Sequence, residues 1–352
     1  MGKSNLTLIV DGNWLLMSRL SVIQNRYADD DDLMYNLQLL ITASIKNVLK
    51  TFPEIDNIVF VADNGSWRTK LPIPGFMKHD ELGAEVEYKG TRIKGDDINW
   101  KLLFVSYDNY ISLLSQSGIT VSKEEDVEGD DWCYWWSTYL NSIGTNCMIW
   151  SKDNDLKQLV RMNDDGVFTV WWNKDNGIYC QEVDTDNMSI LFNINYDSND
   201  KIFNDMCYHS VSVNKINPSQ IIVDKILKGD VSDNIQPVLV RSTSQGTRNY
   251  KISSKDIDYD MNIQNDSVVK TFFEGLLKNK RYIGKVNKTL DEIMEHFEYN
   301  KKLVLLDNTS YPEDIKAIFE KHKDVHMSKN IELVEQQLKG QQSKITGILD
   351  LI

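Results

Sequence analysis

Cysteine and proline are scarce in this sequence, and long apolar runs are missing. The 352 residues include four cysteines, none in a CxxC pair or beside a histidine in a zinc-binding pattern. A disulfide framework and a zinc site are therefore disfavoured, and the cysteines are expected to be small buried side chains in a reducing compartment. No stretch approaches the roughly 20 apolar residues that cross a bilayer, and the first apolar run is too short for a signal peptide. We expect a cytoplasmic protein with no membrane partner.

Positive charge is also in deficit. Lys and Arg total 39 against 52 Asp and Glu, which gives a formal net charge of −13. This balance disfavours a general nucleic-acid binder, because the phosphate backbone attracts Lys and Arg. The deficit is uneven, however, since residues 241–289 contain ten Lys or Arg and only five Asp or Glu. The global figure hides this local basic region.

Four apolar segments each run into carboxylates. They are "LTLIV" before Asp11, "NIVFVA" before Asp63, "ITVSKEEDV" before Glu128 and "NCMIWS" before Asp153. Between them lie segments with apolar residues at three- and four-residue spacing, which is typical of helices. Continuous apolar strands alternating with helices predict an α/β fold with a mostly parallel central sheet and helices on both faces. Ligands of such folds collect at the carboxyl ends of the strands, where these acids stand.

Each acid taken singly has an ordinary explanation. An Asp after a strand is a common turn residue, and acids at the start of a helix are favoured by the helix dipole. A convergent set would instead need raised pKa values or divalent cations. Oxygen ligands without nearby His or Cys favour Mg²⁺ or Mn²⁺, and two such ions suit phosphoryl transfer. The nine candidates are Asp11, Asp63, Glu128, Asp130, Asp131, Asp153, Asp155, Asp230 and Asp233.

The remaining sequence predicts a fifth strand, "GVFTVWW", and mainly helices after residue 200. Residues 241–262 are polar and lack helical periodicity, which predicts a long loop. Behind the "EGDD" acids, a set of aromatic residues shares one helix face by its spacing, so we expect core packing rather than a base-stacking platform. This set is Trp132, Trp135, Trp136 and Tyr139.

Six motifs resemble, in order, those of the 5′-nuclease superfamily, the flap endonucleases and 5′→3′ exonucleases. They are "LIVDGN", "FVADN", "YKGTR", "DVEGDD", "SKDNDLKQL" and "LKGDVSDNI". The segments "KILKGDVSDNIQPVLVRS" and "NKKLVLLDNTSYPEDI" look most like the T-even bacteriophage RNase H branch. The resemblance covers residues 6 to about 320. One departure is that "SDNIQPVLVRSTSQGTRNY" lacks the glycine pattern of the family's duplex-binding hairpin.

The resemblance implies a PIN-like, Rossmann-like catalytic domain over residues 1–195, with an arch or clamp over residues 75–110. A helical DNA-binding domain would follow over 196–330, and a C-terminal helix and tail over 331–352. Two Mg²⁺ ions are implied, with Mn²⁺ as a substitute. The first ion would be held by Asp11, Asp63, Glu128, Asp130 and Asp153, and the second by Asp155, Asp230 and Asp233, with Asp131 acting through water.

The resemblance also implies substrate contacts. Lys89, Arg92 and Arg68 match the family's basic residues that grip the scissile phosphate, where cations stabilise developing charge. Trp67 or Tyr88 is a candidate for stacking on a splayed base, with ordinary packing as the alternative.

Two further contacts are predicted outside these motifs. Arg241, Arg248 and Lys251 are candidates for duplex binding in place of the missing hairpin. The tail has the spacing of a sliding-clamp-binding box without its aromatic pair, and packing of a terminal helix on its own domain is the alternative. The residues of this box are Gln342, Ile345, Ile348 and Leu349.

Together these features predict a monomeric, Mg²⁺-dependent 5′→3′ nuclease and flap endonuclease with RNase H activity, which removes RNA primers during phage DNA replication. Its partners would be DNA and RNA–DNA hybrids with a 5′ end or flap, with a sliding clamp or a single-strand-binding protein as further candidates. One alternative is a PIN-type ribonuclease acting on single-stranded RNA, although such domains are usually shorter. Another is a catalytically inert nucleic-acid-binding module.

Overall fold

A computed structural model shows the chain as two compact units, each built from separate parts of the sequence. Unit 1 comprises residues 1–65, 95–216 and 317–352, and unit 2 comprises 66–94 and 217–316. The functional roles expected for 1–195, 196–330 and 331–352 remain predictions. The structure describes residues 5–27, 29–77, 87–92, 98–181, 195–196, 202–203, 213–243, 246–323, 325 and 327–349.

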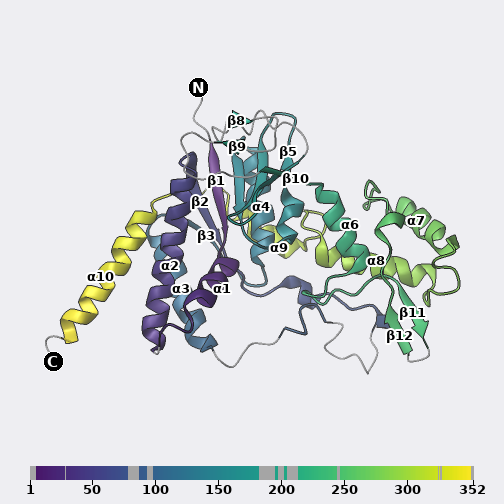
Figure 1. The fold of residues 1–352 in the computed structure, drawn as a ribbon, viewed down its shortest axis with the longest axis horizontal. Helices are drawn as coiled ribbons and strands as arrows, with labels where there is room; N and C mark the ends of the chain where they lie inside the picture. The colour runs from purple at the N-terminus through teal and green to yellow at the C-terminus, as the bar shows by residue number, and fades with distance from the viewer. Residues whose placement is uncertain are drawn as a thin grey trace. The chain divides into compact units, whose positions relative to one another are not determined.

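Unit 1 is built around a mostly parallel sheet of eight strands (Figure 1). Its main path runs in the order β10-β7-β6-β4-β1-β2-β3, with β5 pairing on β6. Strands β3, β2, β1, β4 and β6 are parallel, whereas β7 runs antiparallel to β6. The sequence prediction of the fold class is confirmed. The strands are β1 (Leu6–Asp11), β2 (Ile55–Val61), β3 (Thr120–Ser122), β4 (Asn146–Trp150), β5 (Arg161–Met162), β6 (Phe168–Asn173), β7 (Gly177–Cys180) and β10 (Val213–Lys215).

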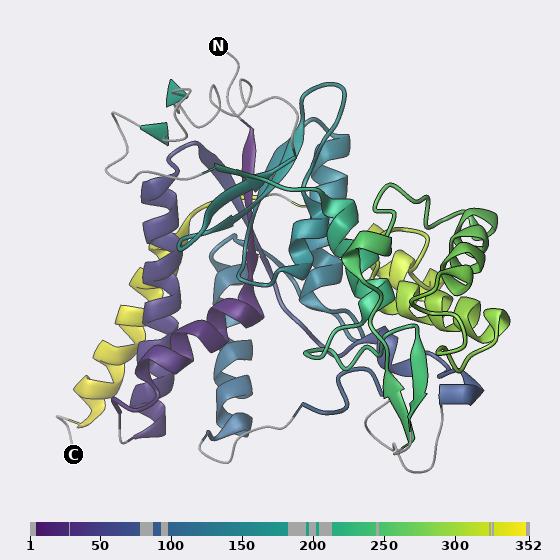
Figure 2. The same cartoon turned by 45° about the vertical axis from the view of Figure 1, so that its right-hand side comes forward.

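Helices cover both faces of this sheet because its central strands are apolar on both sides. Every residue of β1 is buried. Figures 1 and 2 show α2, α3 and α10 together on one face and α4 on the other, where α4 packs on β1 and β4. Within the described part of the chain, no helix has the length and low charge of a membrane span. The helices are α1 (Gly12–Ile23), α2 (Asp30–Thr51), α3 (Trp100–Gln116), α4 (Gly129–Ser142) and α10 (Ile331–Leu349).

Helix α4 begins at the acidic stretch and buries its aromatic face. Trp132, Trp135 and Trp136 are all buried. The Trp132 ring lies 5.1 Å from the ring of Phe319 and 4.5 Å from that of His322. The expectation of core packing is thus confirmed, and these rings form a rigid backing for the helix start.

Unit 2 is mainly helical, with a core formed between α6, α7 and α8. These helices are α6 (Pro218–Lys228), α7 (Asp266–Lys278) and α8 (Leu290–Val304). Helix α9 (Glu313–Glu320) begins in this unit and ends in unit 1. Short 3₁₀ helices are η1 (Trp67–Lys70), η2 (Gly75–Met77) and η5 (Ser254–Asp256) in unit 2, and η4 (Asp155–Leu159) in unit 1.

Two expectations about irregular segments need correction. The predicted loop 241–262 contains an antiparallel hairpin of β11 (Val240–Thr243) and β12 (Gly246–Asn249). Backbone pairing builds this hairpin from polar residues, so hydrophobic periodicity could not reveal it. The predicted strand 119–127 is regular only at Thr120–Ser122. A further two-residue pair joins β8 (Asn195–Tyr196) and β9 (Ile202–Phe203).

The expected arch, 75–110, is described only in part. Residues 78–86 and 93–97 lie outside the described residues. Its last part is the start of α3, where Leu103, Tyr107 and Tyr110 are buried in the core of unit 1. From residue 100 onward the segment is therefore a helix packed in the core of unit 1, and the arch or clamp role expected for 75–110 remains a prediction.

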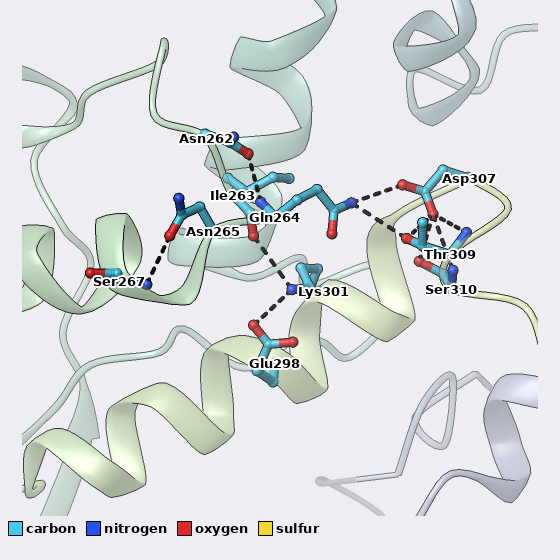
Figure 3. Close-up of polar contacts among 10 residues, drawn as sticks. All are labelled: Asn262, Ile263, Gln264, Asn265, Ser267, Glu298, Lys301, Asp307, Thr309 and Ser310. Atoms are coloured by element: carbon cyan, nitrogen blue, oxygen red, sulfur yellow. Dashed lines mark hydrogen bonds and ion pairs between the residues drawn. The ribbon is translucent and has the colours of Figure 1, made fainter.

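A polar network joins one end of the α7–α8 pair (Figure 3). Gln264 ahead of α7 donates to Asp307 Oδ2 at 2.9 Å, and Asp307 Oδ1 accepts the backbone N–H groups of Thr309 and Ser310. Lys301 of α8 donates to the carbonyl of Ile263 at 3.4 Å. The segment before α7 is thereby tied to the segment after α8.

Candidate metal centre

The parallel register brings the carboxyl ends of four strands to one edge of the unit 1 sheet. Asp11 is paired with Val61, Val61 with Ser122, and Val10 with Trp150. Asp11 ends β1, Asp63 lies two residues after β2, Asp153 three residues after β4, and Glu128 six residues after β3. Strands β2 and β3 lie on one side of β1, and β4 and β6 lie on the other, so the strand order changes direction at β1. Ligands of such sheets usually bind at the carboxyl ends of the strands at this point.

Asp11 is the buried centre of this edge. It is the N-cap of α1, and its side chain accepts the N–H of Trp14 at 3.0 Å and the hydroxyl of Ser151 at 2.6 Å. Burial raises the pKa of Asp11 to about 7 in spite of these two hydrogen bonds, and the charges of Asp63 and Asp153 add to the rise. Three carboxylates thus act on one another within the unit.

Asp63 is positioned by the first turns of two helices, α1 and α4. Its Oδ1 accepts the N–H of Gly129, the first residue of α4, at 2.6 Å. Its own N–H donates to Asn13 Oδ1 at 3.2 Å, which also accepts the hydroxyl of Tyr107 at 3.2 Å. A Cβ on Gly129 would stand 2.9 Å from Asp63 Oδ1, so the close approach depends on glycine. The helix start both binds and orients the carboxylate.

The surroundings of Cys133 add a fourth carboxylate, that of Asp130, to Asp11, Asp63 and Asp153. Burial raises the thiol pKa of Cys133 well above the ordinary value, and the charges of Asp11, Asp130, Asp63 and Asp153 raise it further. Carboxylates at or after three strand ends, together with Asp130 in the first turn of α4, therefore all act on the Cys133 thiol. These four residues are called the acidic cluster below.

Glu128 and Asp131 take part in folding the helix start. The backbone N–H of Glu128 donates to Asp131 Oδ2 at 3.2 Å, an arrangement that caps α4. Both side chains are buried. Their expected roles, as an ion ligand for Glu128 and through water for Asp131, remain predictions beside this structural one.

Asp155 lies next to the acidic cluster in the same unit. It begins η4, and its backbone N–H donates to Asp153 Oδ1 at 2.9 Å. The backbone N–H of Asp153 in turn donates to Ser151 Oγ at 2.9 Å. A short hydrogen-bonded turn thus connects Asp155 to Ser151, the partner of Asp11.

The other two candidate ligands belong to unit 2 and have cationic partners there. Lys225 forms an ion pair with Asp230, whose Oδ1 also accepts the N–H and the hydroxyl of Ser232 at 2.7 Å each. Burial alone would raise the pKa of Asp230, but Lys225 and Ser232 hold it below its ordinary value. Asp233 Oδ1 is 2.6 Å from the guanidinium of Arg92.

The "YKGTR" segment meets the same turn. The N–H of Lys89 donates to the carbonyl of Asp233 at 2.9 Å, and Lys89 has a positive φ of 57°. Its ammonium lies 4.9 Å from the centre of the Tyr88 ring. Unit 2 therefore brings Lys89 and Arg92 together with Asp230 and Asp233, as one turn with both signs of charge.

Three residues predicted to touch the substrate are buried. Trp67 is 4% exposed and packs on Tyr311, and Tyr88 belongs to the core of unit 2. A ring in the core offers no face to a base, so the structure supports the packing alternative for both. Arg68 is 2% exposed, with its guanidinium carbon 4.6 Å from the Trp67 ring centre, and this burial covers the group expected to reach a phosphate.

The remaining predicted binding residues fall mostly beyond the described side chains. The side chains of Arg241 and Arg248, and of the four clamp-box residues after 341, lie outside the described residues. Lys251 is exposed. The start of α10 is described, and Ile331, Val334 and Leu338 are in the core of unit 1.

Sequence reasoning missed four residues that position the acids. Asn13 and Ser151 each hold an acid from a neighbouring strand end, and Gly129 supplies the amide to Asp63. Lys225 neutralises Asp230 from the preceding helix. The first three lie directly beside predicted ligands in "DGN", "WSKD" and "EGDD", so small or amide residues flanking an acid were the available signal.

Comparison with known proteins identifies the fold. No family model matches the sequence, and no curated protein matches it significantly. A zinc-bound 5′-exonuclease of bacteriophage T5 superposes with a TM-score of 0.55 at 15% identity, covering 91% of this chain and 99% of that one. A bacteriophage T5 flap endonuclease in a pseudo-enzyme–product complex with DNA and metal ions gives 0.54 at 16%, covering 94% and 99%. This chain has the fold of those nucleases.

Proposed function

We propose that this chain is a member of the 5′-nuclease superfamily and a divalent-metal-dependent nuclease acting on 5′ ends and 5′ flaps. The observation that carries the proposal is the acidic cluster of unit 1: Asp11, Asp63 and Asp153 stand at or after the carboxyl ends of parallel strands, and Asp130 lies in the first turn of α4. The shared fold supports it, because the bacteriophage T5 structures are a 5′-exonuclease and a flap endonuclease with bound metal ions.

The residues present fit a hard divalent cation. All four side chains of the cluster offer oxygen, and Asp11 is buried beside two like charges, which is costly unless a cation or a proton compensates. Mg²⁺ or Mn²⁺ prefers such ligands. When bound, two ions would lower the pKa of water and stabilise the leaving oxygen of an in-line displacement.

The chain's own residues orient these ligands. Ser151 and the Trp14 amide hold Asp11, and the Gly129 amide holds Asp63, so the carboxylates are preorganised by contacts from neighbouring strand ends. We further propose that Asp155, Asp230 and Asp233 serve a second ion, and that Lys89 and Arg92 contact the scissile phosphate. RNA–DNA hybrids and primer removal, as in the T-even RNase H branch, are the finer proposal for the substrate.

Cleavage of labelled substrates tests the proposal. A 5′-labelled flap duplex, an RNA–DNA hybrid and a single-stranded RNA are each incubated with the protein in Mg²⁺ and in EDTA. Short 5′ products are expected only with Mg²⁺, from the flap and from the hybrid. Cleavage of single-stranded RNA alone would favour the PIN-type ribonuclease, and no cleavage of any substrate would favour the inert binding module.

Two variants within one stretch give a matched comparison. Asp130→Asn removes a charge from the acidic cluster, and Glu125→Gln removes the same charge from an exposed residue five positions earlier. Loss of one metal ligand should cost several kcal/mol of transition-state stabilisation, so Asp130→Asn should cleave at least about 100-fold more slowly. Glu125→Gln should stay within about twofold of the parent. Normal cleavage by Asp130→Asn would contradict this metal site.

A further inference from the structure

The connection between α7 and α8 is the most basic short segment of this acidic chain. Residues 278–288, here called the basic turn, contain five Lys or Arg and no Asp or Glu, while the whole chain has a net charge of −13. None of these residues was singled out by a motif. The structure shows how the turn is built and which of its cations face outward.

One buried tyrosine anchors the turn. Tyr282 is fully buried, and its hydroxyl donates to Asp256 Oδ2 at 2.7 Å and accepts the N–H of Ser253 at 3.0 Å. Arg281 pairs with the same Asp256 at 2.5 Å, and the Arg281 carbonyl accepts the hydroxyl of Tyr250 at 2.8 Å. The tip of the turn is thereby held to segment 250–256.

The C-terminal part of the turn is also fixed. The N–H of Asn287 donates to the carbonyl of Val240 at 3.0 Å. Lys288 points inward, where its ammonium donates to the carbonyl of Val238 at 3.1 Å and contacts His296. Burial lowers the pKa of Lys288 to about 8. The inward lysine therefore serves the fold and leaves the outward ones for other contacts.

Three lysines project from this anchored backbone. Lys278, Lys280 and Lys285 are exposed, and no carboxylate of the described residues lies within ion-pair distance of them. Ile283 stands between the last two and is 59% exposed. The turn thus presents ammonium groups without ion-pair partners in the described part of the chain, on a backbone that is already fixed before any ligand binds. This arrangement suits a ligand with regularly spaced negative charges.

We propose that the basic turn binds the phosphate backbone of the duplex part of the substrate. This inference rests on the proposed nuclease function and deepens it, since the chain lacks the glycine pattern of the family's duplex-binding hairpin. Phosphates spaced along a strand attract Lys side chains, and each contact releases counterions. Preorganisation by Tyr282 lowers the entropic cost of binding, and Ile283 meets the sugar edge between phosphates.

Binding of a fluorescein-labelled 5′-flap duplex, followed by anisotropy in EDTA over a range of salt concentrations, tests the proposal. Lys280→Ala/Lys285→Ala removes two outward cations. We expect its Kd to rise at least tenfold and the slope of log K against log salt to fall by roughly two, about one for each phosphate that is no longer neutralised. Cleavage at saturating substrate in Mg²⁺ should stay near the parent's rate.

The matched control removes the same charge from the two helices that flank the turn. Lys270 of α7 and Lys302 of α8 are both exposed and lie toward the opposite end of the helix pair, which the network of Figure 3 ties together. Lys270 is about 12 Å from the turn by the helical rise. Lys270→Ala/Lys302→Ala should change the Kd by less than about threefold, because the charge it removes is far from the bound strand.

A second variant, Ile283→Glu, places a negative charge at the tip without touching a buried residue. It should weaken binding by at least tenfold, and melting temperatures verify that each variant is folded. Parental affinity and salt slope in both turn variants would overturn the proposal while leaving nuclease activity intact. A third outcome is that the parent binds the duplex, the turn variants do not, and neither the parent nor the variants cleave it. This result would support duplex binding by the basic turn and would contradict the proposed nuclease function.

Discussion

Asp11 combines two roles at one residue, the N-cap of α1 and the buried member of the acidic cluster. A cap favours the charged carboxylate, while burial and two neighbouring acids oppose it. Burial prevails, since the pKa rises to about 7. The charged form of Asp11 therefore destabilises the folded state, and a bound cation would offset this effect.

The raised pKa predicts how the metal-free protein responds to pH. Because the folded state keeps a proton that the unfolded chain releases above its ordinary pKa of 3.8, the contribution to stability is complete at low pH and is lost as pH rises through about 7. Asp11→Asn, whose amide oxygen still accepts the N–H of Trp14 while its NH₂ donates to the hydroxyl of Ser151, should melt at a higher temperature than the parent at pH 8 in EDTA. The difference should shrink at pH 5, as measured by thermal denaturation.

Addition of Mg²⁺ completes this test. It should raise the melting temperature of the parent at pH 8 and change that of Asp11→Asn much less, because binding to the folded state alone stabilises it. Glu125→Gln serves as the control and should respond to pH and to Mg²⁺ as the parent does. Equal stability of parent and Asp11→Asn at every pH would show that Asp11 is not strained by burial.

Glycine at position 129 is predicted to be essential for activity. In Gly129→Ala, the new Cβ would stand 2.9 Å from Asp63 Oδ1, so the carboxylate must move from the Gly129 amide. Cleavage should fall at least about tenfold, the equivalent of about 1.4 kcal/mol in the barrier. Single-turnover kinetics on the flap substrate measure this change.

Gly275 provides the comparison for the same substitution. It lies inside α7, where a Cβ would have no neighbour within 4 Å. Gly275→Ala should keep full activity and gain roughly 0.5–1 kcal/mol in the free energy of unfolding, because alanine loses less backbone entropy in a helix. A loss of activity in both variants would indicate a general sensitivity and not the contact with Asp63.

At the scale of elements, local pattern predicted the regular structure well where apolar residues repeat. The strands before Asp11 and Asp63 and the helix after "EGDD" all form as expected. The hairpin β11–β12 was not predicted, because backbone groups of polar residues make its pairing and apolar periodicity does not mark it. Helix α10 was expected, but its packing against α2 and α3 could not be derived from its sequence alone.

The packing of α10 predicts a structural role for its first turns. Leu338 is fully buried in the core of unit 1, so Leu338→Ala should lower the free energy of unfolding by about 2–5 kcal/mol. Gln336→Ala on the exposed face should cost no more than about 0.5 kcal/mol. Chemical denaturation measures both. Equal effects would mean that the helix does not contribute to the core.

The clamp-binding alternative concerns the residues after this packed part. Deleting 340–352 keeps Ile331, Val334 and Leu338 in place. Loss of clamp binding with intact nuclease activity would support a clamp-binding box, and an unchanged pull-down would reject it.

At the scale of the whole molecule, charge is distributed by unit and by function. The acidic cluster belongs to unit 1, while Lys89, Arg92, Lys225 and the basic turn belong to unit 2. A net charge of −13 therefore does not exclude a nucleic-acid substrate, because cations are gathered where contacts with phosphate are proposed. The amino-acid composition alone disfavoured a nucleic-acid substrate.

The proposed second ion, with Asp155, Asp230 and Asp233 as its expected ligands, can be tested by kinetics. If both serve one ion, Asp155→Asn and Asp230→Asn should each lower kcat/KM strongly, and the double variant should be little worse than the more damaged single one. The pair Glu125→Gln and Asp230→Asn should be additive. Additive losses for Asp155 and Asp230 would mean that they act independently.

The sequence by itself determined the elements and the candidates: apolar strands, each followed by an acid, alternating with helices. These are local properties, since side-chain spacing and helix caps involve residues a few positions apart. Only the tertiary structure decided which acids act on one another, because that depends on strand register between segments far apart in the sequence. It also decided that Trp67, Tyr88 and Arg68 are buried, and that Tyr282 fixes a basic turn with its lysines outward. Burial and pairing are decided by the packing of distant segments, which no short pattern contains.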